Sequence, residues 1–279
     1  MHNVKLTIAY DGTDFRGWQI QPGQPTIQQT ITDVLAKLTQ ERVTIHASGR
    51  TDSGVHALGQ VAHFKTHSEL TPLEFQRALN ALLPAAIRIV GVEEVGSDFH
   101  SRWNAQAKTY LYRIFRGRVV LPFVCRYALH DPFPLDFDAM SEAAQLFEGE
   151  HDFTSFAAST GSEDDDHERN ATRVIFRSQM LRGEDAGERF PALNALGIAR
   201  PGPEEWVYVV RGRSFMRFMV RKIAGTLVDV GRGRLRPDDI PKLFEMKDRS
   251  RSGPTLPPHG LCLLSVEYPD PADSLASRA

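Results

Sequence analysis

The sequence predicts an α+β protein, and two observations carry this prediction. Segments in which apolar and polar residues alternate, as in half-buried strands, are interleaved with segments whose apolar residues recur every three to four positions, as in amphipathic helices. In the first third of the chain they follow in the order strand, helix, strand, strand, helix, strand, which is the ferredoxin-like plan. The 279 residues suffice for one large domain or two ordinary ones.

The helices of the first half have clear start signals. Thr26 precedes an apolar helical repeat and is expected at its N-cap. Thr71-Pro72-Leu73-Glu74 combines a capping box with proline at the first helical position, and Pro84 ends that helix. Trp18 lies in the Gly-rich segment before the first helix, where we expect it to be exposed. The strands are expected at residues 4–10, 43–47, 60–65 and 87–95.

The second half of the chain has a similar alternation of strands and helices, but its order follows the ferredoxin-like plan less closely. Its strands are expected at residues 109–115, 173–180, 206–213 and 261–268, and its helices at 138–147, 215–230 and 237–246. The sequence therefore predicts two ferredoxin-like or RRM-like halves that form one extended antiparallel sheet with a central active-site cleft. We expect domains at 1–105 and 106–270, surface insertions near 159–170 and 183–203, and a disordered tail at 271–279.

Composition narrows the possible functions. No apolar run is long enough to span a bilayer, and the N-terminus lacks the apolar region of a secretory signal. Cys125 and Cys262 are far apart and fit no metal spacing, which favours a reducing cytoplasm. The run Asp164-Asp165-Asp166-His167 is not expected to bind a metal, because consecutive residues on a loop cannot all face one ion without strain.

The segment Ser48–Ala57 brings an acid, a base, two glycines, hydroxyl groups and an imidazole into ten positions. It lies between two predicted strands, is longer than an ordinary hairpin turn, and carries the carboxylate of Asp52 close to the guanidinium of Arg50. Asp and Gly are also the usual residues of turns, so an isolated Asp in this setting most often only caps a turn. The residues alone leave both interpretations open.

This segment resembles the catalytic motif of the TruA family of tRNA pseudouridine synthases. The resemblance covers Gly49–Ala57, with Ser53 where the family pattern has alanine. Other stretches that resemble the family are residues 10–28, 59–64, 99–112, 149–156 and 214–225. The resemblance therefore extends along most of the chain, and the two insertions are its least similar parts.

The resemblance implies an isomerase that converts uridine to pseudouridine at positions 38, 39 and 40 of the tRNA anticodon arm. The glycosidic bond breaks, the uracil turns, and its C5 bonds to C1′. No net oxidation occurs, so neither a cofactor nor a metal is expected, in keeping with a sequence that has no dinucleotide-binding, P-loop or zinc motif. The family also implies a cytoplasmic homodimer in which one tRNA spans both subunits.

The resemblance also implies roles for five residues. Asp52 is the catalytic carboxylate, and the ordinary aspartate pKa of about 3.9 leaves it ionised at neutral pH. Whether it attacks covalently or removes a sugar proton stays open. Tyr110 stacks on the uracil, Arg221 pairs with Asp52, and Leu263 packs against the flipped base. Arg50 fills the gap left by the extruded base.

Two features have a second interpretation from the residues alone. Tyr110 shares a strand face with Tyr112 and Ile114, which equally suits a core aromatic. The basic run 211–236 suits either a solvated surface or phosphate contacts. The net charge is −2, but ten acidic residues lie between 160 and 205, and the rest of the chain is slightly basic.

Two other function classes compete with the isomerase. An RRM-type RNA-binding module shares the expected topology. Its characteristic aromatic motif is only weakly matched, however, by residues 213–218. A glycoside hydrolase needs two carboxylates around the glycosidic bond, whereas the Ser48–Ala57 segment offers one carboxylate and an arginine. Conversion of the RNA, as opposed to binding alone, separates the isomerase from the binding module.

Overall fold

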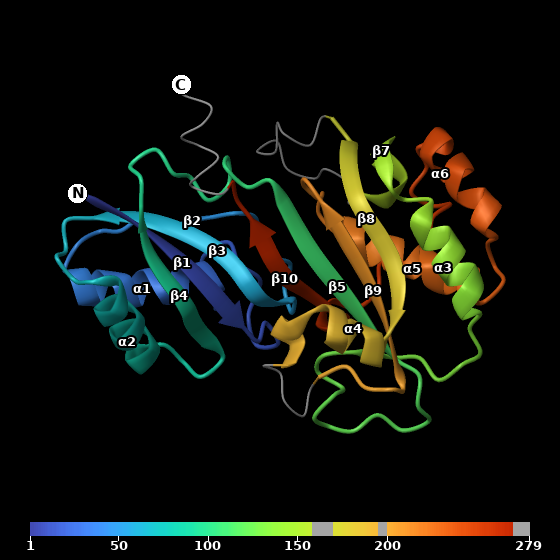
Figure 1. Ribbon diagram of the computed structural model, residues 1–279, viewed down its shortest axis with the longest axis horizontal. Coiled ribbons are helices and arrows are strands. Elements are labelled where there is room, and N and C mark those ends of the chain that lie inside the picture. Colours follow the sequence, from blue (N-terminus) through green and yellow to red (C-terminus); the bar gives the residue numbers. More distant parts are fainter. Residues whose placement is uncertain (158–169, 195–199, 270–279) are drawn as a thin grey trace. The chain divides into compact units, whose positions relative to one another are not determined.

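The computed structural model describes residues 1–157, 170–194 and 200–269, so most of the acidic insertion, including Asp164–His167, and the tail from 271 lie outside the described residues. The chain divides into two compact units (Figure 1). The first unit contains Met1–Lys108 and the segment that begins at Cys262, and the second contains Thr109–Leu261. The last strand, which the sequence places in the second half, thus belongs mainly to the first unit, because it pairs with a strand there.

The first unit has the predicted ferredoxin-like topology. Its elements are β1 (His2–Tyr10), α1 (Ile27–Thr39), β2 (His46–Ala47), β3 (His56–Thr66), α2 (Pro72–Leu82), β4 (Ile87–Val95) and β10 (Leu261–Glu267). The strand order is β4-β1-β3, and β2 pairs with β3 as well. β1 is antiparallel to both of its neighbours, whereas β10 joins β3 in parallel, with Leu263 opposite Ala57.

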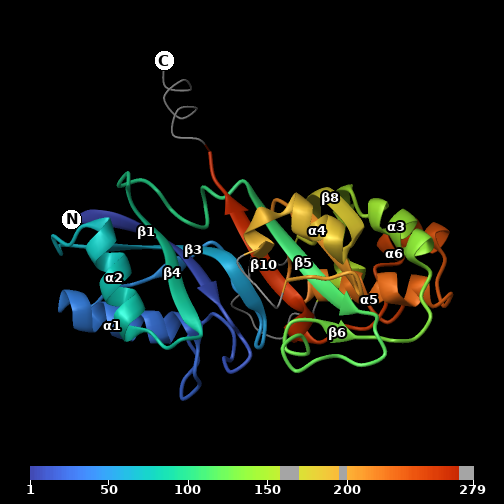
Figure 2. The ribbon, with the colours of Figure 1, turned by 60° about the horizontal axis from the view of Figure 1, so that its bottom comes forward.

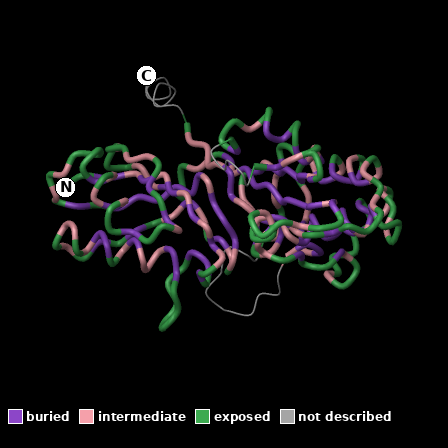
Figure 3. Tube along the Cα trace, turned by 90° about the horizontal axis from the view of Figure 1, so that it is seen from below, coloured by how far each residue is buried: buried purple, intermediate pink, exposed green. Residues whose placement is uncertain are grey.

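The predicted caps explain where the two helices of this unit begin. The Thr26 side chain accepts a hydrogen bond from the Gln29 amide at the start of α1. At the start of α2, Thr71 and Glu74 form the reciprocal capping box. The helices contact one another beside the strands of their unit (Figure 2). Buried stretches run through the interior of each unit, and exposed stretches lie at its periphery (Figure 3).

The second unit is built on four principal strands in the order β5-β9-β8-β7. Its elements are β5 (Ala107–Phe115), β6 (Leu129–His130), α3 (Phe137–Gln145), β7 (Gly149–Asp152), β8 (Thr172–Arg182), α4 (Gly183–Arg189), β9 (Glu205–Gly212), α5 (Met219–Gly231) and α6 (Ile240–Met246). The α+β class is confirmed. The strands are not all antiparallel, because β6 joins β5 in parallel, as β10 joins β3. Such two-residue pairings leave no periodic signal in the sequence.

Helix α5 begins four residues later than expected. Phe218 has a φ of +64°, so the backbone turns there and the helix starts at Met219 instead of Phe215. Phe215 is thereby left outside the helix, with its ring edge-on to Tyr110 at 5.2 Å between centroids. Within α5, a Cβ on Gly225 would lie 1.8 Å from the Pro254 carbonyl oxygen, so glycine is required by this close approach.

The expectation of a surface loop at 183–203 is wrong for its first part. Residues 183–189 form α4, in which Gly183 and Ala186 are buried. A Cβ on Gly183 would lie 2.1 Å from the Gly202 carbonyl oxygen. The small residues therefore permit close packing of backbone segments, which composition alone cannot distinguish from loop chemistry. Across the described residues, none of the helices has the length and apolar character needed to cross a membrane.

Candidate active site

The loop that carries Asp52 comprises Ser48–Val55, between the end of β2 and the start of β3. Residues 43–45 are not in a strand, although Val43 and Ile45 are buried as their alternation predicts. β3 begins at His56, four residues earlier than expected. The loop is therefore shorter than predicted, but it is longer than a tight hairpin turn.

The loop is anchored to the segment that follows β1. The Trp18 amide donates to the Thr51 carbonyl at 3.1 Å, and the Gly54 amide donates to the Phe15 carbonyl at 3.2 Å. The hydroxyls of Tyr10 and Thr51 are hydrogen-bonded at 2.8 Å. Trp18 is only 1% exposed, so its expected exposure is wrong. Its ring is tilted toward the ring of the buried Tyr10, with 6.2 Å between the centroids.

Two glycines let these backbones approach. A Cβ on Gly12 would lie 2.0 Å from the Val55 carbonyl oxygen, and one on Gly17 would lie 2.7 Å from that of Thr51. Gly17 also has a φ of +88°, a conformation that other residues rarely adopt. Both glycines are therefore needed to bring the β1–α1 connection against the loop.

Asp52 is half-buried at the turn of this anchored loop. Its carbonyl accepts a hydrogen bond from the Val55 amide at 3.1 Å, and Gly54 completes the turn with a φ of +79°. Thr51, the preceding residue, is buried. The backbone on both sides of Asp52 is thus fixed by hydrogen bonds, which is how a loop holds a reactive carboxylate in one position.

A buried polar group braces the start of the loop. The Ser48 hydroxyl donates to the Gln60 Oε1 at 2.7 Å, and the Gln60 Nε2 donates to the Gly49 carbonyl at 3.0 Å. From β5, the Lys108 Nζ donates to the Ser48 carbonyl at 2.6 Å. Burial, with a smaller contribution from the charge of Arg102, lowers the Lys108 pKa to about 8. Lys108 was not predicted as a functional residue from the sequence, although it is a half-buried ionisable group beside the Asp52 loop.

The pKa of Lys108 leads us to expect that activity falls at alkaline pH. Its ammonium is protonated below a pH of about 8 and neutral above it. A neutral amine donates a weaker hydrogen bond to the Ser48 carbonyl than an ammonium does. We expect the rate of pseudouridine formation in single turnovers to fall as the pH rises through about 8. Lys108→Arg, which stays charged, should hold its rate to higher pH.

The control for this prediction is Lys108→Met, which removes the titrating group. Its rate is expected to be lower at pH 7 and to lack the fall near pH 8. If the rates of all three proteins fall at the same pH, the RNA or another residue titrates there, and the role given to Lys108 is wrong.

Tyr110 and Leu263 both have buried side chains. Tyr110 lies on β5 and is 8% exposed, with its ring held edge-on by Phe215. Leu263 lies on β10 and is 1% exposed. Tyr112, two residues after Tyr110, donates its hydroxyl to the Pro257 carbonyl at 2.8 Å. Tyr110 thus has the packing of a core aromatic, and its contact with a base stays a prediction.

Arg221 is half-buried on α5, and its pairing with Asp52 stays a prediction. Its Nε donates to the Leu256 carbonyl at 2.7 Å, and its guanidinium carbon lies 5.0 Å from the centre of the Phe218 ring. The next residue, Lys222, is 7% exposed. The Lys222 Nζ donates to the Ser252 hydroxyl at 2.6 Å and to two nearby backbone carbonyls. Lys222 is therefore bound by groups of its own unit. Neither interpretation of the basic run, a solvated surface or phosphate contacts, applies to this residue.

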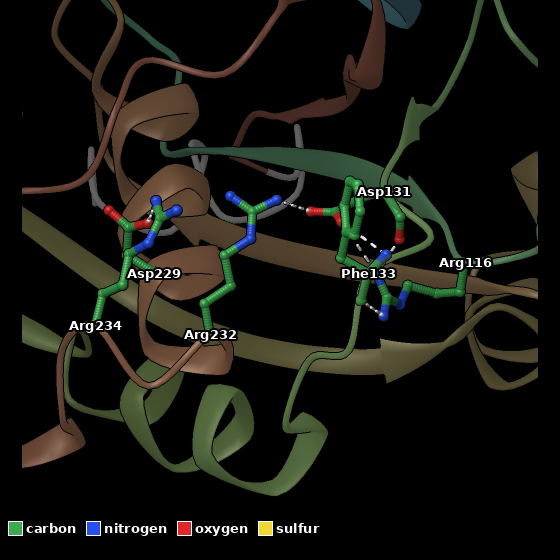
Figure 4. A network of polar contacts seen from close by, with 6 residues as sticks. All are labelled: Arg116, Asp131, Phe133, Asp229, Arg232 and Arg234. Atoms are coloured by element: carbon green, nitrogen blue, oxygen red, sulfur yellow. Dashed lines mark hydrogen bonds and ion pairs between the residues drawn. The ribbon is translucent and has the colours of Figure 1, made fainter.

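The end of the basic run is paired with carboxylates (Figure 4). Arg232 contacts the 3% exposed Asp131 side chain at 2.7 Å, and Arg234 contacts Asp229 at 3.1 Å. Arg116, on the chain segment after β5, also pairs with Asp131 and donates to the Phe133 carbonyl. The exposed residues Arg213 and Arg217 remain the better candidates for phosphate contacts.

Among the residues that the structure describes, no three or more His, Cys, Asp or Glu side chains are grouped so that they could hold a metal ion. Arg50 is exposed on the same loop as the half-buried Asp52. The first unit therefore presents a carboxylate and a guanidinium on one anchored loop, an arrangement suited to acid–base or nucleophilic chemistry on a polyanionic substrate.

Comparison with known proteins identifies the family. The family model described as tRNA pseudouridine synthase matches residues 6–104 and 143–269. tRNA pseudouridine synthase A of Solibacter usitatus is 43% identical over 268 residues, covering 96% of this chain and all of that protein. The protein of the same name from Caldicellulosiruptor saccharolyticus is 42% identical, with the same coverage of both chains. Desulfotalea psychrophila has a tRNA pseudouridine synthase A 1 that is 41% identical over 270 residues, again with 96% of this chain covered. These matches, which extend along both compact units, show that the chain belongs to the tRNA pseudouridine synthase family.

Proposed function

We propose that this chain isomerises uridine to pseudouridine at positions 38, 39 and 40 of the tRNA anticodon arm, with Asp52 as the catalytic carboxylate. Family membership shows the reaction class, an isomerisation of uridine in tRNA. The observation that carries the proposal further is the Ser48–Val55 loop, in which Asp52 is half-buried on a backbone tied to the β1–α1 connection. A carboxylate held in this way suits attack on C1′ or removal of a sugar proton.

The other four residues act on the extruded nucleotide. Tyr110 stacks on the uracil, and its edge-on contact with Phe215 supports this role by fixing the ring plane. Arg50 is exposed on the same loop as Asp52, and its side chain enters the RNA base stack at the place that the extruded uracil has left. Arg221 pairs with the Asp52 carboxylate and keeps it ionised. Leu263 is placed two residues into β10, opposite Ala57, and packs against the base.

The enzyme acts as a cytoplasmic homodimer in which one tRNA spans both subunits. Exposed arginines of the segment before α5, such as Arg213 and Arg217, contact RNA phosphates and position the substrate through charge and shape. Such contacts carry little base readout. They suit an enzyme that modifies several neighbouring positions in many tRNAs.

The test is a position-by-position assay of pseudouridine on an unmodified tRNA transcript with uridines at 38, 39 and 40. Conversion at these positions and nowhere else in the tRNA is expected. Conversion in another arm would overturn the choice of positions. Tight binding without any conversion would favour a binding module. Release of free uracil would favour a hydrolase.

A further inference from the structure

Trp103 is a large aromatic side chain exposed on the first unit. It is 62% exposed, whereas Trp18 is 1% exposed and Trp206 is half-buried. The three are all the tryptophans of the chain. A single exposed apolar side chain is common on protein surfaces, so the exposure of Trp103 is not by itself the mark of a binding site.

A hydrogen-bonded turn after β4 fixes the position of Trp103. The His100 amide donates to the Asn104 Oδ1 at 2.6 Å, and the Asn104 amide donates back to the His100 carbonyl at 3.0 Å. The amides of Arg102 and Trp103 approach the His100 Nδ1 at 3.1 and 3.4 Å. The exposed ring therefore stands on an ordered turn.

Two histidine rings in contact with one another lie behind the Trp103 ring. The His100 ring lies 5.3 Å from Trp103 and 4.6 Å from the ring of His63, which is 3% exposed. Burial is the largest cause that lowers the pKa of both histidines, to about 4 for His63. Neutral, flat rings thus continue from the core to the exposed indole.

A positively charged side chain lies against the exposed ring. The Arg102 guanidinium carbon lies 5.1 Å from the centre of the Trp103 ring, within the range of a cation–π contact. Arg102 and Lys65 are exposed, and both add positive potential at His100. An exposed aromatic ring beside a cationic side chain is an arrangement with which proteins bind unpaired bases of RNA.

We propose that Trp103 and Arg102 form a stacking platform for an unpaired nucleobase of the RNA substrate, separate from the uridine that reacts. The platform rests on the proposed function, because it takes a second nucleotide of the same RNA. Trp103 stacks on the base, and Arg102 contacts its phosphate. Stacking is tolerant of sequence because every base has a π face, which suits an enzyme that accepts many tRNAs.

Binding is measured by titrating the full-length protein with unmodified tRNA and following tryptophan fluorescence. Quenching is expected for the wild type, because Trp103 is the exposed indole, and it should vanish in Trp103→Phe. Trp103→Ala should weaken tRNA binding about 5- to 150-fold, the range for loss of one stacked base. Trp103→Phe should retain most of the affinity. The conversion rate at saturating tRNA should be unchanged in both.

Three controls make the result decisive. Leu82→Ala removes a side chain that is similarly exposed, at 56%, on α2 of the same unit, and should have no effect. A blunt RNA duplex without unpaired bases should bind wild type and Trp103→Ala equally. Arg102→Gln should reduce the salt dependence of tRNA binding by about one phosphate contact, which Trp103→Ala should not do.

Several outcomes would overturn the platform. They are unchanged tRNA affinity in Trp103→Ala, an equal loss of affinity for the duplex, or a lower oligomeric state in sedimentation, which would mark Trp103 as a contact between copies of the chain. Failure of the proposed function looks different: fluorescence quenching by tRNA with no pseudouridine formed would reject the activity and leave the platform in place.

Discussion

Asp52→Asn is expected to lower the rate of pseudouridine formation by at least about 10³-fold, while tRNA affinity stays within a few-fold of the wild type. The amide has nearly the shape of the carboxylate, but it is neutral and is neither a nucleophile nor a base. The loop should keep its conformation, because the hydrogen bonds that fix it at Thr51, Asp52 and Gly54 use backbone atoms. The measurement is single-turnover conversion together with a binding titration.

Two further variants test whether the position of the carboxylate matters. Asp52→Glu retains the charge but moves it by one methylene, and a large loss of rate is expected because the anchored loop cannot adjust. Ser53→Ala is the matched control: Ser53 is exposed, and its hydroxyl makes only a 3.3 Å contact with the Phe15 carbonyl. Its rate should remain near the wild-type value. Conversion by Asp52→Asn at the wild-type rate would reject Asp52 as the catalytic group.

Arg113→Met is expected to lower the free energy of unfolding by about 3–5 kcal/mol. Arg113 on β5 forms two hydrogen bonds of 2.8 Å with the Glu205 carboxylate on β9, and both side chains are 3% exposed. Removal of the arginine leaves a buried carboxylate without its partner, whose desolvation is then uncompensated. Equilibrium unfolding in urea, followed by circular dichroism, measures the change.

The double variant Arg113→Met with Glu205→Leu separates the pair from the space it fills. Because both charges are removed and the volume is largely retained, most of the lost stability should return. Arg234→Gln is the exposed control, since its pairing with Asp229 at the surface is expected to contribute less than about 1 kcal/mol. If Arg113→Met unfolds at the wild-type urea concentration, the buried pair does not stabilise the second unit.

Features that depend on neighbouring residues could be predicted from the sequence. The capping signals at Thr26 and Thr71 place the starts of α1 and α2 correctly, because a cap is made within four residues. The order of elements in the first unit and the Ser48–Val55 loop were also predictable, since strand alternation and glycine-rich turns are local patterns. The family resemblance, confirmed by the comparisons, likewise depends on residues in sequence order.

Features that depend on distant residues could not be predicted in this way. Trp18 lies in a Gly-rich polar segment, yet its side chain is buried and its amide donates to the Thr51 carbonyl, 33 positions away in the sequence. Lys108 and Lys222 have the sequence environment of exposed bases. In the folded chain the Lys108 Nζ donates to the Ser48 carbonyl, and the Nζ of the buried Lys222 donates to the Arg249 and Gly253 carbonyls. The left-handed backbone conformation of Phe218 could not be predicted from the sequence either, because the apolar helical pattern continues through this residue.

The α+β class, the starts of the helices in the first unit and the loop that carries Asp52 were thus predictable from local sequence patterns. The parallel pairing of β10 with β3, the close approach of Gly12 and Gly17 to the loop, and the contact of the His63 and His100 rings behind Trp103 became apparent from the folded structure. The physical reason is that periodicity and capping act within a few residues. Burial and strand pairing are instead set by residues that meet only when the chain has folded.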